Sequence, residues 1–140
     1  MSKLRAVWLY LAITGALAIS GNGQQTARRA GATLRQVATI DLPGAAGKRF
    51  DYLTTDEEDH YLLSAHLAAG LLYVIDMETN RLVKAIPDVP GVEGVEFAPD
   101  MKKVYTSDWY ENKIGVVDLR QMKVIRKIPT EEKPDGSAYA

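Results

Sequence analysis

A repeat without gaps organises most of this 140-residue chain. Two short apolar runs, residues 71–76 and 114–118, both end in aspartate, and these aspartates lie 42 positions apart. The same offset holds across a whole unit, where it pairs Leu53 with Val95, Leu62 with Val104, Leu72 with Ile114, Val74 with Val116, Val83 with Ile125, Ile86 with Ile128 and Pro87 with Pro129. A period of about 40 to 50 residues with four short strands is typical of β-propeller blades.

Each unit contains four predicted strands, named a to d in chain order, because β-branched and aromatic residues fill short segments that turn residues bound. In the first unit, residues about 50–91, they lie near 51–55, 61–65, 71–76 and 81–86. In the second, about 92–133, they lie near 94–98, 103–107, 114–118 and 123–128. Residues 37–42 repeat the spacing of strand d and predict a closing strand ahead of the first unit. The predicted fold class is therefore all-β.

The predicted β-propeller is incomplete. A ring needs about four to eight blades so that every sheet is covered by its neighbours. Residues 34–140 supply the closing strand, two four-stranded blades and the start of a third unit near 134, and Ala140 falls inside its first strand. We therefore expect the repeat to belong to a longer protein. The alternative is a short protein of which several copies close one ring.

Residues 1–20 have the pattern of a secretory signal peptide. Lys3 and Arg5 precede an uncharged run, residues 6–19, that is too short for the roughly 20 residues of a membrane-spanning helix. Small residues follow, so we expect cleavage after Ser20 and export to the periplasm, cell surface or medium. The alternative is an uncleaved anchor. Residues 21–33 are polar and small and are predicted to be a flexible tether, and no later segment predicts a membrane span.

Composition excludes several classes of function. The formal net charge is −1 and the basic residues are spread along the chain, which gives no strong nucleic-acid signal. The chain has no cysteine, so disulfides, thiol catalysis and thiolate zinc sites are excluded. No nucleophile elbow, phosphate loop, dinucleotide fingerprint or HExxH motif occurs.

Two stretches of the repeat carry a family resemblance. Residues 72–87 (LYVIDMETNRLVKAIP) and 104–129 (VYTSDWYENKIGVVDLRQMKVIRKIP) resemble the YncE-like proteins of the YVTN β-propeller repeat family, and residues 133–140 (KPDGSAYA) are similar to its repeat opening. The tetrapeptide that names the family is altered to residues 105–108 (YTSD) and 63–66 (LSAH). The resemblance implies an exported protein, usually seven-bladed and often without an assigned catalytic activity.

The candidate ligand-binding residues lie in the loops after strands b and d, on the face that we name the top of the propeller: His66, Asp108, Trp109, Tyr110 and Glu111. Asp88, Glu131, Glu132 and Asp135 from the loops after strand d accompany them, and such a set could bind a cation through oxygen or nitrogen. The alternative is a polar surface facing solvent. Trp109 and Tyr110 either stack on a ligand or cap the space between blades. Asp76 and Asp118 are predicted to be structural turn residues.

The predicted function is a non-catalytic binding or scaffold module, whose partner is an unidentified small molecule or protein at the top face. No cofactor is indicated by the sequence. The alternative is an enzyme, either a metal-dependent propeller hydrolase of the lactonase type or a protein similar to the quinoprotein dehydrogenases. For that role, the loosely placed residues are Asp51, Glu93, Glu96 and Asn112.

Overall fold

The computed structural model describes residues 34–45 and 49–140, so the predicted signal peptide (1–20) and tether (21–33) lie outside the described residues. Residues 36–140 form one compact unit. Within the described ranges, no helix is long and apolar enough to span a bilayer.

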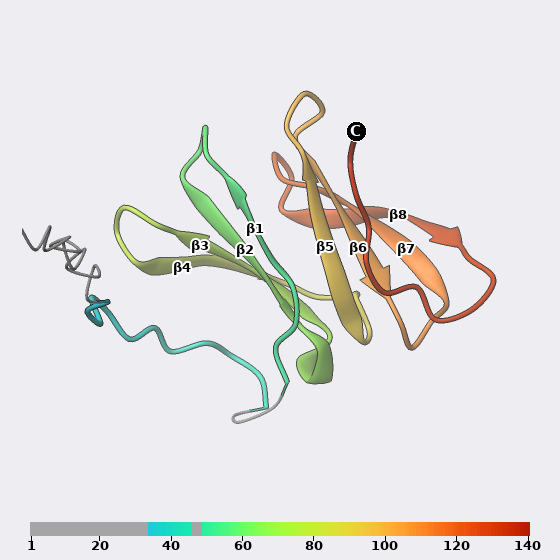
Figure 1. The fold of residues 1–140 in the computed structure, drawn as a ribbon, viewed down its shortest axis with the longest axis horizontal. Helices are drawn as coiled ribbons and strands as arrows, with labels where there is room; N and C mark the ends of the chain where they lie inside the picture. The colour runs from blue at the N-terminus through green and yellow to red at the C-terminus, as the bar shows by residue number, and fades with distance from the viewer. Residues whose placement is uncertain (1–33, 46–48) are drawn as a thin grey trace, which may run out of the picture. The chain divides into compact units, whose positions relative to one another are not determined.

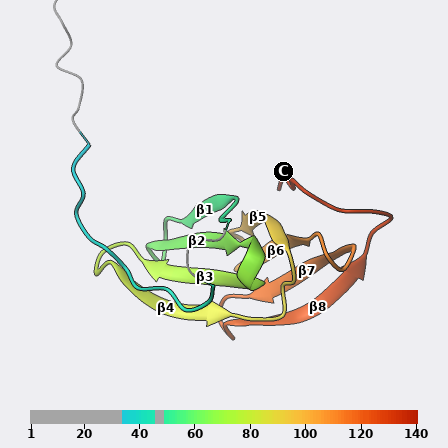
Figure 2. The same ribbon diagram turned by 90° about the horizontal axis from the view of Figure 1, so that it is seen from below.

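Two antiparallel sheets of four strands make up this unit (Figures 1 and 2). Blade 1 contains β1 (Leu53–Asp56), β2 (Tyr61–His66), β3 (Leu71–Asp76) and β4 (Arg81–Ile86). Blade 2 contains β5 (Val92–Ala98), β6 (Lys103–Asp108), β7 (Lys113–Asp118) and β8 (Lys123–Pro129). A short 3₁₀ helix, η1 (Leu67–Ala69), joins β2 to β3. The predicted all-β class and the predicted order of four strands in each unit are confirmed.

Turn chemistry shapes the hairpins of both blades. Asp76 Oδ1 accepts hydrogen bonds from the backbone N–H groups of Glu78 and Thr79, at 2.9 and 2.8 Å. Asp118 Oδ1 accepts one from Gln121 at 3.1 Å. These bonds close each c–d turn locally, as aspartate commonly does at the start of a turn. They also hold the pKa of Asp76 below its ordinary value.

The hydrophobic core lies between the two blades. Because side chains alternate along a strand, β2 and β3 turn Leu63, Leu72 and Val74 toward it, and the opposite face of blade 1 receives Ser64, His66 and Tyr73. Blade 2 contributes its own alternate residues to the same core, namely Val95, Phe97, Val104, Val117 and Leu119. The two sheets are therefore joined by burial of apolar surface.

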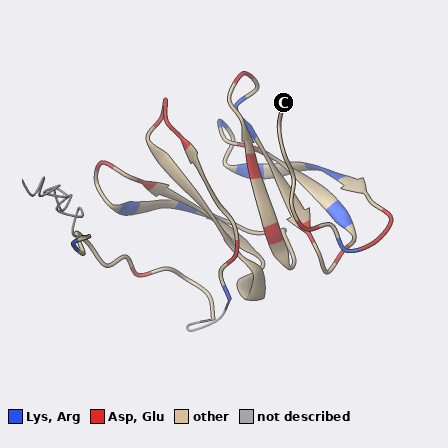
Figure 3. Cartoon of the chain, viewed as in Figure 1, with Lys and Arg blue, Asp and Glu red and all other residues tan. Residues whose placement is uncertain are grey.

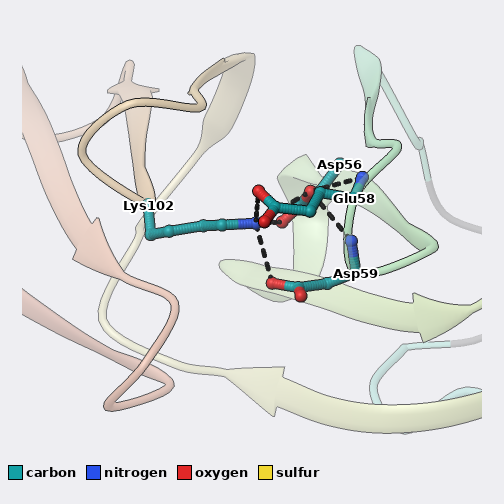
Figure 4. Close-up of polar contacts among 4 residues, drawn as sticks. All are labelled: Asp56, Glu58, Asp59 and Lys102. Carbon is teal, nitrogen blue, oxygen red and sulfur yellow. Dashed lines mark hydrogen bonds and ion pairs between the residues drawn. The ribbon is translucent and has the colours of Figure 1, made fainter.

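A lysine also fastens the two blades together (Figure 4). Lys102, in the β5–β6 turn, reaches carboxylates at the end of β1 and in the β1–β2 turn. Its Nζ lies 3.1 Å from Asp56, 3.0 Å from Glu58 and 2.9 Å from Asp59. Asp56 is buried and its Oδ1 also accepts the backbone N–H groups of Glu58 and Asp59. The hydrogen bond to Asp59, followed by those to the other carboxylates, raises the pKa of Lys102. We call these four side chains the Lys102 clasp.

Two segments differ from the sequence prediction. Residues 37–42, expected as a closing strand, form no strand in the structure, because no described strand pairs with them. Residues 136–140, expected to open a third blade, also form no strand, although they return alongside blade 2 (Figure 1). There Tyr139 donates a hydrogen bond to Asp100 at 2.6 Å, and the carbonyl of Asp135 packs so close to Gly94 that a Cβ at Gly94 would clash with it. An apolar, β-branched segment becomes a strand only when a partner supplies the ladder of hydrogen bonds.

Candidate functional site

His66 ends β2 and is only 3% exposed. The ring of Phe50 stacks on its imidazole, with ring centroids 4.2 Å apart and planes 11° apart. Nδ1 of the imidazole lies 2.8 Å from the hydroxyl of Tyr73, which is on the neighbouring strand β3. Burial lowers the pKa of His66 and raises that of Tyr73, so both rings are neutral near pH 7.

The hydrogen bonds around Tyr73 determine which nitrogen of His66 carries its proton. The Tyr73 hydroxyl has one proton and donates it to the carbonyl oxygen of Pro43, which can only accept. The contact between Tyr73 and Nδ1 of His66 must therefore use a proton on Nδ1. In a neutral imidazole, this leaves Nε2 unprotonated, as a hydrogen-bond acceptor. Nε2 is buried and has no partner among the residues that the structure describes.

A pocket of about 310 Å³ opens beside this histidine. Its walls are His66, Tyr73 and Phe50 together with Ile40 and Leu42 of the segment that precedes blade 1. That segment passes close to blade 1 at Gly44, whose φ of +112° suits glycine and where a Cβ would lie 2.9 Å from the Cβ of Ala69. We call this cavity the His66 pocket.

The repeat-equivalent position in blade 2 is Asp108, at the end of β6. It is fully buried, and its carboxylate accepts hydrogen bonds from Thr106 Oγ1 at 2.9 Å and from Lys127 Nζ at 2.6 Å. Lys127 Nζ also lies 3.2 Å from Glu111 Oε2. Burial raises the pKa of Asp108, and the bonds from Lys127 and Thr106 offset part of that rise. Burial lowers the pKa of Lys127, but its bonds to the two carboxylates outweigh burial and leave that pKa raised.

One cross-strand row explains why the two blades differ. In blade 1 the row is Ser64, Tyr73 and Ala85, so the large ring of β3 fills the space above the sheet and its hydroxyl meets His66. In blade 2 the equivalent row is Thr106, Gly115 and Lys127. Because Gly115 has no side chain, Lys127 can reach across it to Asp108. The polar group of blade 2 is thus satisfied within its own sheet, whereas Nε2 of His66 is not.

Trp109 and Tyr110 lie where the loops of the two blades meet. Their rings contact each other, with centroids 5.4 Å apart. Their backbone N–H groups donate to Gly91 and Pro90 of the β4–β5 loop, at 3.1 and 3.3 Å. Lys133 Nζ lies 4.7 Å from the centroid of the Trp109 ring, so a cation of the same chain occupies that aromatic face. These contacts favour the capping role over the ligand-stacking role.

Only some of the five predicted site residues contact one another in the structure. Asp108 and Glu111 share Lys127, and Trp109 contacts Tyr110, but no contact among the described residues links any of them to His66. Asp88, Glu131 and Glu132 are exposed. Within residues 34–45 and 49–140, no group of three or more histidine, aspartate or glutamate side chains is placed to hold a metal ion.

Arg49 lies beside three carboxylates, of which the sequence analysis had grouped only Asp51 and Glu93. Asp51 and Glu93 both form ion pairs with its guanidinium, and Asp135 contributes to its electrostatic environment. Glu93 is one of two acidic side chains on β5 (Figure 3), and burial, followed by the nearby Asp135 charge, raises its pKa. Asp51, Glu93 and Asp135 follow one another at the repeat offset, so that offset was the signal that could have revealed them.

The residues named for an enzymatic role do not form one site. Asp51 and Glu93 are held by Arg49. Glu96 instead lines a separate cavity of about 300 Å³ with Tyr105 and Ile114. The side-chain oxygen of Asn112 accepts the backbone N–H of Lys133 at 2.9 Å.

Comparison with known proteins supports the fold. No family model matches the chain, and no curated protein matches it. Among solved structures, the chain is similar to hydrazine synthase from Kuenenia stuttgartiensis (TM-score 0.59, 17% identity, covering 69% of this chain and 28% of that one). It is also similar to apo AztD from Citrobacter koseri (0.57, 20%, 69% and 27%) and to the Cps50 (Swd1) β-propeller domain from Myceliophteria thermophila (0.53, 13%, 60% and 27%).

The chain thus spans little more than a quarter of the structures that it matches. At these identities, the likeness concerns the fold alone. Together with the two four-stranded sheets and the constant repeat offset, it shows that strands β1 to β8 form two blades of a β-propeller.

Proposed function

We propose that this chain is a non-catalytic binding module of an exported β-propeller protein, and that its small-molecule site is the His66 pocket. One observation supports this choice above the others: His66 Nε2 is a buried acceptor without a protein partner among the described residues, on the wall of a 310 Å³ cavity. A buried polar atom without a partner is costly, so such an atom beside a cavity is a reason to look for a ligand. The repeat-equivalent Asp108 gives no such reason, because Lys127 and Thr106 already bind it.

A screen of small aromatic compounds by protein-observed NMR tests this proposal. Compounds that bind should shift the His66 ring resonances of the purified protein. Binding should be lost in His66→Leu and kept in His60→Asn, because His60 is exposed in the β1–β2 turn and asparagine tolerates its positive φ of 57°. Hits that bind His66→Leu as well as wild type would place the site elsewhere. Metal-dependent turnover of a lactone or a similar ester would contradict the non-catalytic role.

Export is the second part of the proposal and is supported by the charge and apolar pattern of residues 1–20. When the gene is expressed in a bacterium, we expect the exported protein to begin near Gly21. Removal of Lys3, Arg5 and the apolar run should abolish export. Edman sequencing or intact mass measurement checks this, and exported protein that still begins at Met1 would contradict signal cleavage.

A further inference from the structure

The proton on His66 decides which chemical group the pocket accepts. We propose that the His66 pocket binds a neutral ring compound that carries an N–H or O–H donor, and that this donor bonds to Nε2 of His66. This inference rests on the proposed binding function and adds the polarity of the ligand to it.

The first step is the direction of each hydrogen bond. The Pro43 carbonyl accepts the Tyr73 proton, and the Tyr73 oxygen accepts the Nδ1 proton of His66. Each bond fixes the next, so the imidazole can only accept at Nε2. A ligand that offers a carbonyl, an ether or a carboxylate to Nε2 would bring two acceptors together. A ligand with a donor would satisfy the only polar atom of the pocket-lining side chains that has no partner among the described residues.

The second step concerns the charge and size of the ligand. The pocket walls are apolar or aromatic at Ile40, Leu42 and Phe50, and no ionised side chain is among the residues that line it. Placing a charged group there would cost its hydration energy without a counter-charge. The volume of about 310 Å³ is near the lower end of the range of about 300–1,000 Å³ for ligand pockets, which suits a compound of one or two rings. Phe50, stacked on His66, also lines the pocket, so an aromatic ring is available for contact with such a ligand.

Indole and benzofuran test the inference because they have nearly the same shape, while indole offers an N–H donor and benzofuran an ether oxygen. Titration of the purified protein by NMR should give a dissociation constant for indole about two- to tenfold lower than for benzofuran, as one added hydrogen bond implies. In Tyr73→Phe, Nδ1 loses its fixed partner and either tautomer becomes available, so the ratio should fall toward one. Tyr139→Phe is the matched control, since its hydroxyl bonds to Asp100, away from the pocket.

A ligand-free measurement keeps the test independent of any variant. The ¹⁵N spectrum of wild-type protein should show the proton of neutral His66 on Nδ1. A proton on Nε2, or coupling of Nε2 to an N–H group of the protein itself, would overturn the inference. Equal binding of indole and benzofuran would overturn the donor preference while leaving the binding function in place. Binding of neither compound would overturn both.

Discussion

His66 and Asp108 occupy the same repeat position, but their polar groups are satisfied in different ways. The imidazole relies on Tyr73 and Phe50 and stays neutral, whereas the carboxylate of Asp108 relies on Lys127. The difference follows from the residue at the centre of one cross-strand row, tyrosine in blade 1 and glycine in blade 2. A single substitution at a repeat position can therefore change the polar contacts of a blade without changing the order of its strands.

The stability of the protein should decrease as the pH falls through the range just below 6.5. Burial lowers the pKa of His66 from 6.5. In this pH range, His66 therefore binds a proton in the unfolded chain but not in the folded chain. Unfolding is then favoured as the pH falls, and the stability from a neutral, buried His66 is complete only above about pH 6.5. Urea unfolding at several pH values between 5 and 8 measures this slope.

His66→Gln should reduce that slope, and His60→Gln reports the effect of removing an exposed histidine. A slope that is unchanged in His66→Gln would show that His66 does not cause it. The carboxylates with lowered pKa, such as Asp59 and Asp76, lose their contribution at lower pH and affect a separate range.

Gly115→Ala should destabilise blade 2. A Cβ at this position would clash with Thr106 Oγ1 and lie 2.8 Å from Asp108 Oδ2, so the hydrogen bonds of Asp108 would have to move. We expect a loss of about 1–3 kcal/mol in the free energy of unfolding. Gly136→Ala is the control, because the nearest atom to its added Cβ is 3.6 Å away. Equal unfolding midpoints for the two variants would contradict this role of Gly115.

At the scale of elements, the repeat offset predicts the strands well because each blade repeats the same alternation of apolar residues. The strand ends differ by one or two positions; β5 begins at Val92 rather than 94, and β1 at Leu53 rather than 51. The partners of His66 were not predicted. Phe50 opens the first unit, but its repeat equivalent is Val92, so the repeat gave no sign of a stacking ring. Pro43, which accepts the Tyr73 hydroxyl, precedes that unit. The polar role of Tyr73 was not predicted, because this residue lies in an apolar run typical of a buried strand.

The ion pairs between elements could not be predicted from the sequence pattern either. Lys127 reaches Asp108 because Gly115 lies between them on the sheet, and that path requires the register of three strands. Lys102 meets Asp56 across two blades, a contact of long sequence separation that no local pattern indicates. Residues 37–42 show the converse case. Their pattern predicted a strand, but they form none because no described strand pairs with them.

Lys102→Met should weaken the contact between blades 1 and 2. The variant leaves the buried carboxylate of Asp56 without its cation, and a buried charge without a partner destabilises the fold. The urea midpoint should fall, whereas Lys84→Met, on the exposed side of β4, should leave it nearly unchanged. If the two variants unfold at the same midpoint, the clasp does not contribute to stability.

At the scale of the whole molecule, the middle strands of each blade and β5 are the most buried elements. β2, β3, β6 and β7 have a partner strand on both sides and bury most of their residues. β4 and β8 lie at sheet edges, and Ile86 is the one fully buried residue in these two strands. The apolar core between the blades draws on the middle strands and on β5, which supplies Val92, Val95 and Phe97.

Amide hydrogen exchange should therefore be slowest in β2, β3, β6 and β7 and faster in β4 and β8. Edge strands open with less loss of buried surface, so their amides exchange through smaller fluctuations. Mass spectrometry of peptides after exchange in D₂O measures the order. Exchange in β8 as slow as in β7 would show that a further contact covers this edge.

The Lys102 clasp also bears on how repeated units find their correct neighbours. Sheets of nearly identical shape can stack in the wrong order or exchange between molecules, a common failure of repeat proteins. The lysine half of the clasp is in blade 2, where blade 1 has His60 at the equivalent position, and the acidic half is in blade 1. The repeat equivalents of Asp56, Glu58 and Asp59 are Ala98, Asp100 and Met101. A second copy of blade 2 stacked in the place of blade 1 would offer Lys102 one carboxylate instead of three, so the clasp favours blade 1 over a second blade 2 as the neighbour of Lys102.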